Sequence, residues 1–247
     1  MKKWNLVLAI GMALGSAACG NNQALMDAAV KVAQQAGQGG VVDGALGSGE
    51  IAAGLKEALR VGADNVVGRL GRPDGFRLDP KVHIPLPENL RKAREVAARF
   101  GLDGRFAELE NRLNAAAEAA TPKAKRLFVD AISQMTLEDA RAILNGPDDA
   151  ATRYFEEKTS DRLAAEMKPI VDSSMAEVGV LQAYDSVLSG LGPAAGMLPD
   201  LKTDLSSYVV GKAMDGIFTY LAAEEAAIRK DPAKRTTELL RKVFGRR

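Results

Sequence analysis

The residue with the clearest chemistry is Cys19, the only cysteine of the chain. It follows the small residues Ser16-Ala17-Ala18, which end a short apolar run behind Met1-Lys2-Lys3. A charged start, an apolar run and small residues make up a bacterial export signal, and a cysteine directly behind them resembles a lipobox. We therefore expect a signal peptide over residues 1–18. The thiol of Cys19 is then expected to carry a diacylglycerol and to begin the mature protein.

One alternative stays open at this site. Ser16 stands where a lipobox usually has leucine, and Ser16-x-Ala18 would also suit an ordinary signal peptidase. We favour acylation because a lone thiol has no disulfide partner in an oxidising compartment. The apolar run is shorter than the roughly 20 residues of a membrane-spanning helix, so the expected membrane contact is the acylated Cys19. Gly20 stands where an inner-membrane retention signal would place aspartate, which favours the periplasmic face of the outer membrane.

Residues for catalysis or metal binding are scarce. The single histidine, His83, excludes a zinc site built on several histidines, and no serine lies in a nucleophile elbow for a Ser-His-Asp triad. We interpret His83 as a surface or loop-packing residue. The stretch Gly62–Arg69 lacks the Lys-Ser/Thr of a phosphate loop, and the glycines from 37 to 49 follow no strand. We expect no metal, no cofactor and no catalytic residue.

Paired carboxylates are more numerous, at Asp148-Asp149, Glu156-Glu157 and Glu224-Glu225. Neighbours in sequence point about 100° apart on a helix, so these pairs do not form acid/base dyads by themselves. Asp148-Asp149 follows Pro147, where negative side chains complement a helix dipole. We expect these two carboxylates to occupy that helix end and to leave no place for another anion. A carboxylate-dependent hydrolase is the least favoured function.

The segment 187–201 is rich in glycine and proline and carries no charge until Asp200. We expect it not to form a continuous helix. An exposed apolar loop is unfavourable, so the segment caps the hydrophobic core, forms a mobile lid over an apolar groove between helices, or forms a patch that touches lipid. The candidate ligand contacts are Leu191, Met197 and Leu198 in the lid, with Met167 and Met214 as walls.

The charge balance argues against nucleic acid as a partner. Without Lys2 and Lys3 the chain keeps 31 Lys and Arg against 32 Asp and Glu, a formal net charge of −1. Basic residues gather between Lys230 and Arg247, which we interpret as the solvated face and last turn of a helix.

The composition predicts an all-α fold. Apolar residues make up 47% of the chain but aromatic residues only 5%, and alanine, leucine and valine suit close-packed helices better than sheets. We expect a flexible tether with a short amphipathic segment over 19–49. A single compact domain of short and medium helices, arranged otherwise than in a regular bundle, is expected over 50–247.

Prolines and glycines punctuate this domain. Four prolines and two glycines between Gly71 and Pro87 predict an ordered loop. Thr121-Pro122 predicts an N-cap and first helical position, Thr136 with Asp139 resembles a capping box, and Gly101 is expected to end a helix. The apolar side chains expected to pin the loop are Phe76, Leu78, Ile84 and Leu86. The expected helices cover 51–67, 88–100, 106–116, 122–135, 137–144, a stretch through Tyr154 and Phe155, 160–177, 177–190, 203–229 and a last helix from Asp231-Pro232.

From Gly54 to Gly245 the chain resembles the bacterial domain of unknown function numbered 4197, found in exported proteins that are often predicted lipoproteins. The resemblance implies a compact helical domain outside the cytoplasm and implies no activity or ligand residues. The motifs that carry it are Gly71-Arg72-Pro73-Asp74-Gly75-Phe76, Ile84-Pro85-Leu86-Pro87, Leu144-Asn145-Gly146-Pro147-Asp148-Asp149-Ala150-Ala151-Thr152 and Arg235-Thr236-Thr237.

Three hypotheses follow for the function. The first is a lipid-anchored, non-catalytic module that holds an apolar or lipid-like ligand. The second, ranked close behind, is an envelope module that docks on another protein, and the third is the hydrolase. An apolar cavity favours the first, an exposed apolar patch over a solid core favours the second, and converging carboxylates with raised pKa values favour the third.

Overall fold

The computed structural model describes residues 46–136, 138, 140–197 and 202–245, and of residues 197 and 202–204 it describes the backbone only. Leu46–Arg247 form one compact unit. The predicted signal peptide (1–18), Cys19, the amphipathic segment at 25–32 and Leu198 lie outside the described residues. The predicted tether extends two residues too far, because Ser48 and Gly49 already belong to the first described helix.

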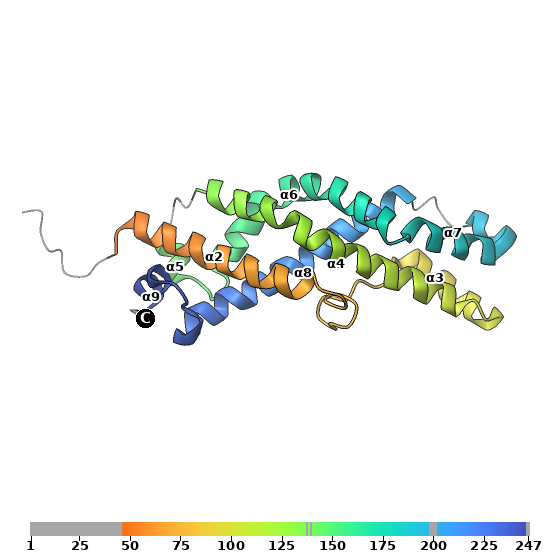
Figure 1. Cartoon of the computed structure of the whole chain (residues 1–247), viewed down its shortest axis with the longest axis horizontal. Coiled ribbons are helices and arrows are strands. Elements are labelled where there is room, and N and C mark those ends of the chain that lie inside the picture. The colour runs from red at the N-terminus through yellow and green to blue at the C-terminus, as the bar shows by residue number, and fades with distance from the viewer. Residues whose placement is uncertain (1–45, 137, 139, 198–201, 246–247) are drawn as a thin grey trace, which may run out of the picture. The chain divides into compact units, whose positions relative to one another are not determined.

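Every regular element in the described ranges is a helix, which confirms the all-α prediction (Figure 1). None of the described helices is both long enough and apolar enough to cross a membrane. The α-helices are α2 (Ser48–Leu70), α3 (Glu88–Ala97), α4 (Asp103–Gln134), α5 (Ala140–Asn145), α6 (Ala150–Glu177), α7 (Val180–Leu191), α8 (Lys202–Lys230) and α9 (Glu238–Phe244), and the short 3-10 helices are η1 (Ala98–Phe100), η2 (Gly192–Met197) and η3 (Pro232–Lys234).

The four long helices α2, α4, α6 and α8 form an antiparallel bundle (Figure 1). Each packs along two others in the ring order α2, α4, α6, α8, and the diagonal pairs touch much less. Asn65 in α2 donates to Glu224 in α8 (2.8 Å), and one turn later Arg69 donates to Tyr220 (2.9 Å), so α2 and α8 run in opposite directions. The prediction of a non-bundle arrangement was wrong, because we ended helices at residues that these long helices contain.

Pro122 lies inside α4 instead of starting a new helix. The hydroxyl of Thr121 donates to the Ala117 carbonyl (2.7 Å) and so bonds within the helix rather than capping a new one. The proline ring packs so closely on Gly71 that a Cβ there would lie 2.9 Å from Pro122 Cδ. Packing thus outweighs the local helix-start signal. In the same way α6 runs unbroken from Ala150 and contains Pro169.

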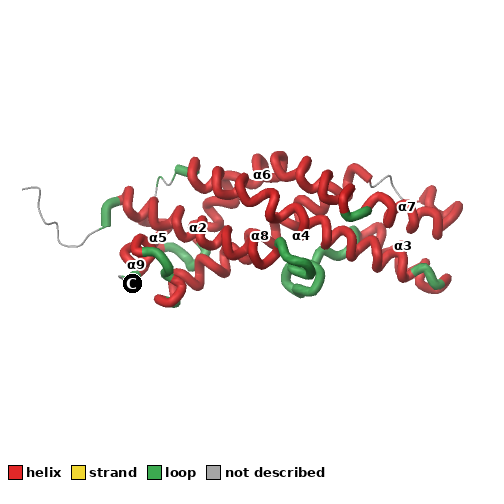
Figure 2. The backbone as a smooth tube through the Cα atoms, viewed as in Figure 1, coloured by secondary structure: helices red, strands yellow, loops and turns green. Residues whose placement is uncertain are grey.

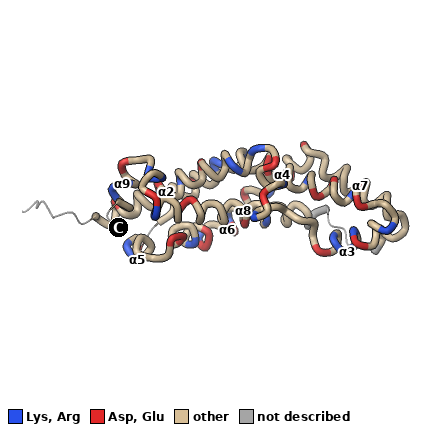
Figure 3. Tube along the Cα trace, turned by 90° about the horizontal axis from the view of Figure 1, so that it is seen from below, with Lys and Arg blue, Asp and Glu red and all other residues tan. Residues whose placement is uncertain are grey.

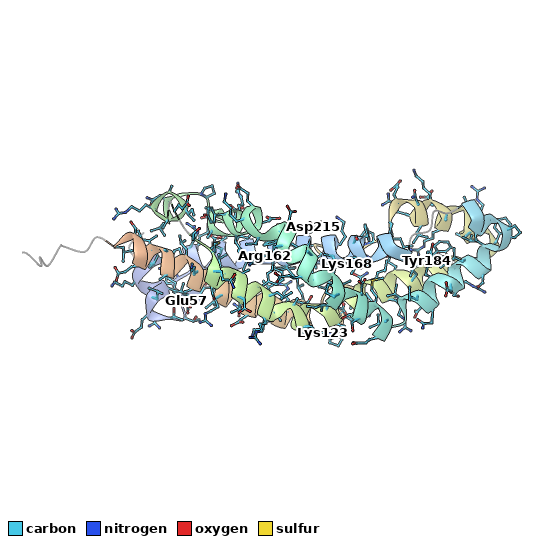
Figure 4. All side chains as sticks on the ribbon, turned by 90° about the horizontal axis from the view of Figure 1, so that it is seen from above. Glu57, Lys123, Arg162, Lys168, Tyr184 and Asp215 are labelled. Carbon is cyan, nitrogen blue, oxygen red and sulfur yellow. The ribbon has the colours of Figure 1, made fainter. Side chains whose placement is uncertain are left out.

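An aromatic cluster joins three of the long helices. Phe128 in α4, Phe155 in α6 and Phe218 in α8 meet edge to face, with ring centroids 5.8 to 6.5 Å apart. Such pairs contribute about 0.5–1.5 kcal/mol each beyond the burial of their area. At the surface, Lys123 and Lys168 (labelled in Figure 4) add ties between neighbouring helices, from Lys123 to Glu177 and from Lys168 to Ser206.

The loop from Gly71 to Pro87 is ordered, as predicted, and lies against the bundle (Figure 2). Phe76, Ile84 and Leu86 are buried and pin it as expected. Leu78 does not pin the loop, because its side chain is 65% exposed. Leu78 faces solvent. Hydrogen bonds, together with the buried apolar side chains, hold the loop.

Two buried polar side chains of α4 supply these bonds. One carboxylate oxygen of Glu118 accepts the backbone N–H groups of Phe76 and Arg77, both at 3.0 Å. Asn114 accepts the N–H of Ile84 (2.9 Å) and donates to its carbonyl (2.8 Å). Buried backbone groups need such partners, so α4 acts as a template for the loop.

A buried ion pair within α8 joins the end of α5 to the start of α6. The side chains of Glu225 and Arg229 are each 1% exposed, and Arg229 Nε donates to Glu225 Oε1 (2.8 Å). Arg229 also donates to the carbonyls of Ile143 (3.0 Å) and Leu144 (2.7 Å) at the end of α5. The guanidinium therefore satisfies carbonyl groups that a helix C-terminus leaves without partners.

The carboxylate of Glu225 binds the start of α6. It accepts the backbone N–H groups of Ala151 (3.0 Å) and Thr152 (2.7 Å) and the Thr152 hydroxyl (2.7 Å). Asp149 is the N-cap residue of α6, but its side chain makes no capping hydrogen bond. Our expectation that Asp148-Asp149 leaves no place for another anion at this helix end was wrong. Asp148 pairs with Lys230 and Asp149 with Arg153, so the anion at this N-terminus comes from a residue far along the chain.

The motif Arg235-Thr236-Thr237 ends one helix and begins the next. Arg235 donates to the carbonyls of Ile228 (3.0 Å) and Arg229 (2.9 Å) at the end of α8. The Thr237 hydroxyl accepts the N–H of Leu240 and caps α9. The last helix therefore begins at Glu238, because residues 232–234 form only a 3-10 turn after Asp231.

The substitution Glu225→Gln leaves Arg229 as a buried charge without its counter-charge. We expect it to lower the free energy of unfolding by about 3–5 kcal/mol. Urea denaturation followed by helical circular dichroism measures this. The matched control is Glu224→Gln on the preceding, more exposed residue, where we expect less than about 1 kcal/mol. Equal losses in the two variants would contradict the account.

The substitution Glu118→Ala removes two charge-assisted hydrogen bonds to the loop, each contributing about 1.5–3 kcal/mol. We expect trypsin to cleave after Arg77 at least tenfold faster, since local opening becomes less costly. Peptide mapping over time measures the rate. Glu108→Ala, on the exposed face of the same helix, serves as the control and should leave the rate unchanged. Cleavage after Arg77 at the wild-type rate in Glu118→Ala would show that Glu118 does not hold the loop.

Candidate functional site

An apolar groove of about 840 Å³ lies between α3 and the end of α7. Both helices lie at the end of the bundle opposite α5 and α9 (Figures 1 and 3). The residues that line the groove are Asn89, Lys92, Ala93, Val96, Ala97, Phe100, Leu102, Gly190, Leu191 and Ala194.

One wall is a face of α3 and η1 that no other described element covers. Leu90 and Ala97 attach α3 to the core, whereas Val96 is 61% exposed and Phe100 is 77% exposed. The segment ends at Gly101, as predicted, with a left-handed φ of 74° that favours glycine. Two large apolar side chains one turn apart are thus presented to the groove.

Arg94 holds this wall to α4. Its Nε donates to Asp103 (2.7 Å) and its Nη1 to Glu110 (3.3 Å). The hydrogen bond from Arg94 lowers the pKa of Asp103, and the same bond raises the pKa of Arg94. Glu110 is also hydrogen-bonded to His83 Nε2 (2.8 Å), whose Nδ1 is bonded to the carbonyl of Arg77 (2.9 Å). These contacts agree with the interpretation of His83 as a loop-packing residue.

The opposite wall comes from the segment 187–201, which we expected not to form a continuous helix. Over its described residues the α-helix α7 ends at Leu191, one residue beyond the expected helix 177–190, and the 3-10 helix η2 follows. The change of direction occurs at Gly192, whose φ is 54°. Arg105 of α4 ties the end of α7 in place by donating to the carbonyl of Ser186 (2.6 Å) and to the hydroxyl of Ser189 (3.1 Å).

The predicted contact residues do not all meet at this groove. Leu191 lines it and is half-buried. Met167 and Met214 are buried in the bundle core and do not line it, so their assignment as walls was wrong. The reason is that methionines at helical spacing face neighbouring long helices. The side chain of Met197, and Leu198, lie outside the described residues.

Sequence reasoning missed Val96 and Phe100. A signal for them exists in the expected helix 88–100, where Leu90, Ala93, Val96 and Phe100 lie on one apolar face about 120° wide at 100° per residue. A helix with a surplus apolar face either lies in a core or offers that face to something else.

The groove carries little charge. Its one charged lining residue is Lys92, whose Nζ lies 3.4 Å from Glu88 on the solvent side. Elsewhere on the domain, residues of both signs are scattered along the helices (Figure 3). The arrangement suits an uncharged hydrocarbon group.

Carboxylate chemistry finds no support in the described part of the chain. Four carboxyl groups there have clearly shifted pKa values, and all four are lowered, whereas a general acid needs a raised value. Within the same residues no cluster of His, Cys, Asp and Glu could hold a metal ion. The lowered groups are Asp79, Asp103, Asp149 and Glu177.

The family model described as "Protein of unknown function (DUF4197)" matches residues 45–245, and the chain therefore belongs to this family. The match confirms the resemblance drawn from the sequence motifs. Neither a curated protein nor a solved structure matches the chain.

The Arg94–Asp103 pair predicts a measurable titration. Asp103 should titrate below about 3.9, the usual value for aspartate, because Arg94 stabilises its charged form. Its contribution to stability is present above that usual value and is lost as the pH falls through the lower folded pKa. Arg94→Met should return the pKa of Asp103 towards the usual value in a carboxyl-carbon NMR titration. Asp149, whose pKa is lowered by Arg153, is the internal control. An unchanged Asp103 titration would contradict the assignment.

Proposed function

We propose that this protein is a lipid-anchored module of the bacterial envelope that binds an acyl chain, or a similarly apolar ligand, in the groove between α3 and α7. The observation that carries the proposal is the exposure of Val96 and Phe100 on one wall of an apolar groove. We assign no catalytic role to the domain.

The energetic support comes from the exposed side chains. Burying a side chain such as valine or phenylalanine contributes about 1.5–3 kcal/mol relative to leaving it in water. Phe100 is among the few large apolar residues that the described domain exposes, and it lies beside Val96 rather than alone. Apolar side chains that adjoin in a groove mark a binding surface more often than scattered ones do.

The shape and charge of the groove support a hydrocarbon ligand. The wall from Asn89 to Phe100 covers about 18 Å at 1.5 Å per residue. The volume of about 840 Å³ falls within the roughly 300–1,000 Å³ of small-molecule sites. The charged group of Lys92 points to Glu88 and not to an open counter-charge, so a neutral chain fits better than an ionic one.

The predicted anchor supports the same ligand class. Acylation at Cys19, which lies outside the described residues, would give a stable attachment through two or more chains. The protein would then work beside a membrane whose lipids contain the proposed ligand, on the periplasmic face of the outer membrane.

Docking of a partner protein is the second candidate. The observation in its favour is the 77% exposure of Phe100, which would let an apolar helix face of a partner contact the ring. The two candidates differ in what the purified protein binds by itself.

Titration of the full chain in neutral detergent with a fluorescent fatty acid tests the proposal. We expect saturable binding by the wild type and at least tenfold weaker binding by Val96→Asp/Phe100→Asp, because a charge cannot be solvated beneath a bound chain. The matched control is Leu181→Asp, which places the same charge at another exposed apolar residue (41%) outside the groove.

The control should bind the probe as the wild type does, and both variants should keep the wild-type helical circular dichroism. Absence of saturable binding, or equal binding by the groove variant, would contradict the ligand proposal. The second candidate would then be tested by asking whether the same variant loses a protein partner in cross-linked membranes.

A further inference from the structure

Arg72 is the charged residue of the loop motif Gly71–Phe76 whose side chain contacts no partner among the described residues. Gly71 donates its N–H to Val67 and lies too close to Pro122 for a Cβ. A Cβ at Gly75 would lie 2.5 Å from the Leu70 carbonyl oxygen. Phe76 is buried. The Arg72 side chain is exposed and has no hydrogen bond or ion pair to any described residue.

Arg72 lines a polar pocket of about 510 Å³ between the loop and the neighbouring parts of α2 and α8. Three joined side chains form one side of it. Arg69 donates to Asp79 (3.0 Å) and to Tyr220 (2.9 Å), and its guanidinium lies 4.0 Å from the centroid of the Tyr220 ring. Tyr220 in turn donates to Asp79 (2.5 Å). This network is preorganised and leaves little freedom to its members.

The carboxylates of the pocket already have partners. Asp74 accepts from Arg77 Nε (2.7 Å). Asp79 is held by Arg69 and Tyr220. Burial raises the pKa of Asp79, but the hydrogen bonds from Tyr220, the Lys81 N–H and Arg69 together outweigh burial, so the pKa is lowered overall. The side chain of Lys81, like that of Arg72, is exposed and forms no ion pair within the described ranges. Two cations of the pocket are therefore uncompensated.

We propose that this pocket binds a phosphate group through Arg72 and Lys81. A phosphate monoester carries close to two negative charges at neutral pH and matches the two cations, whereas a carboxylate would neutralise one. The planar guanidinium of Arg72 can donate two parallel hydrogen bonds to phosphate oxygens. Leu78, 65% exposed, lines the same pocket and offers an apolar contact to the rest of the ligand.

The pocket is independent of the apolar groove. Glu118 contacts the loop and Leu102 lines the groove, and their separation of 16 positions corresponds to about 24 Å along α4. A phosphate monoester could come from a soluble phosphate ester or from the headgroup of phosphatidic acid. Both present the same chemistry to Arg72 and Lys81, and the attached group distinguishes them.

Isothermal titration calorimetry of the full chain in neutral-detergent micelles tests the proposal with two phosphate monoesters as probes, glycerol phosphate and dihexanoyl phosphatidic acid, at constant ionic strength. We expect the wild type to bind at least one probe and Arg72→Gln/Lys81→Gln to bind it at least tenfold more weakly. The matched control is Arg99→Gln/Lys234→Gln, two exposed cations outside this pocket, which should bind as the wild type does.

The outcomes separate the two sources. Binding of glycerol phosphate assigns a soluble phosphate ester, and binding of the lipid alone assigns a headgroup. If neither probe binds, or if both double variants lose binding equally, the site is overturned. Because Arg72 and Lys81 are exposed, the melting temperature should stay unchanged, so loss of binding would not come from unfolding.

Discussion

The fold depends on one buried ion pair, Glu225 with Arg229. Burying two charges in a core is unfavourable unless hydrogen bonds surround them. Here the carboxylate accepts backbone N–H groups at the start of α6, and the guanidinium donates to carbonyls at the end of α5. No buried side-chain nitrogen or oxygen in the described part of the chain lacks a partner. The pair sets the position of α8 against α6 and so brings Phe155 and Phe218 together. Leu144, Ala151 and Thr152 of the motif at 144–152 are hydrogen-bond partners of this pair, so the motif has a structural role.

The same principle operates along α4, whose polar side chains position the loop, α3 and the end of α7. Asn114 and Glu118 hold the loop, and Arg105 holds the end of α7. Asp103 and Glu110 hold α3 through Arg94. The groove is the consequence: α3 and α7 are each tied to α4, and the apolar face of α3 between them has no cover. Function is thus proposed at the place where the packing leaves an apolar face open.

Local signals in the sequence predicted the helical class, the ordered loop and the end of a helix at Gly101. They failed where a distant residue decides the outcome. Pro122 reads as a helix start, yet packing on Gly71 keeps it inside α4. Glu225 stands in the sequence as one of two adjacent carboxylates, yet its partners at 151–152 lie more than 70 residues away. For the site, Leu191 could be predicted from an uncharged segment. The walls at Met167 and Met214 could not be predicted correctly, because spacing alone does not tell a core face from a groove face.

The central claim, an acyl chain in the groove between α3 and α7, is tested most directly by photo-crosslinking. A fatty acid with a diazirine near the end of its chain is bound to the full chain, irradiated, and the labelled peptides are mapped by mass spectrometry. The account predicts labels concentrated in residues 89–102 and 190–194 that an excess of unlabelled fatty acid removes. Labels spread over the surface of the long helices, or unaffected by competition, would contradict it.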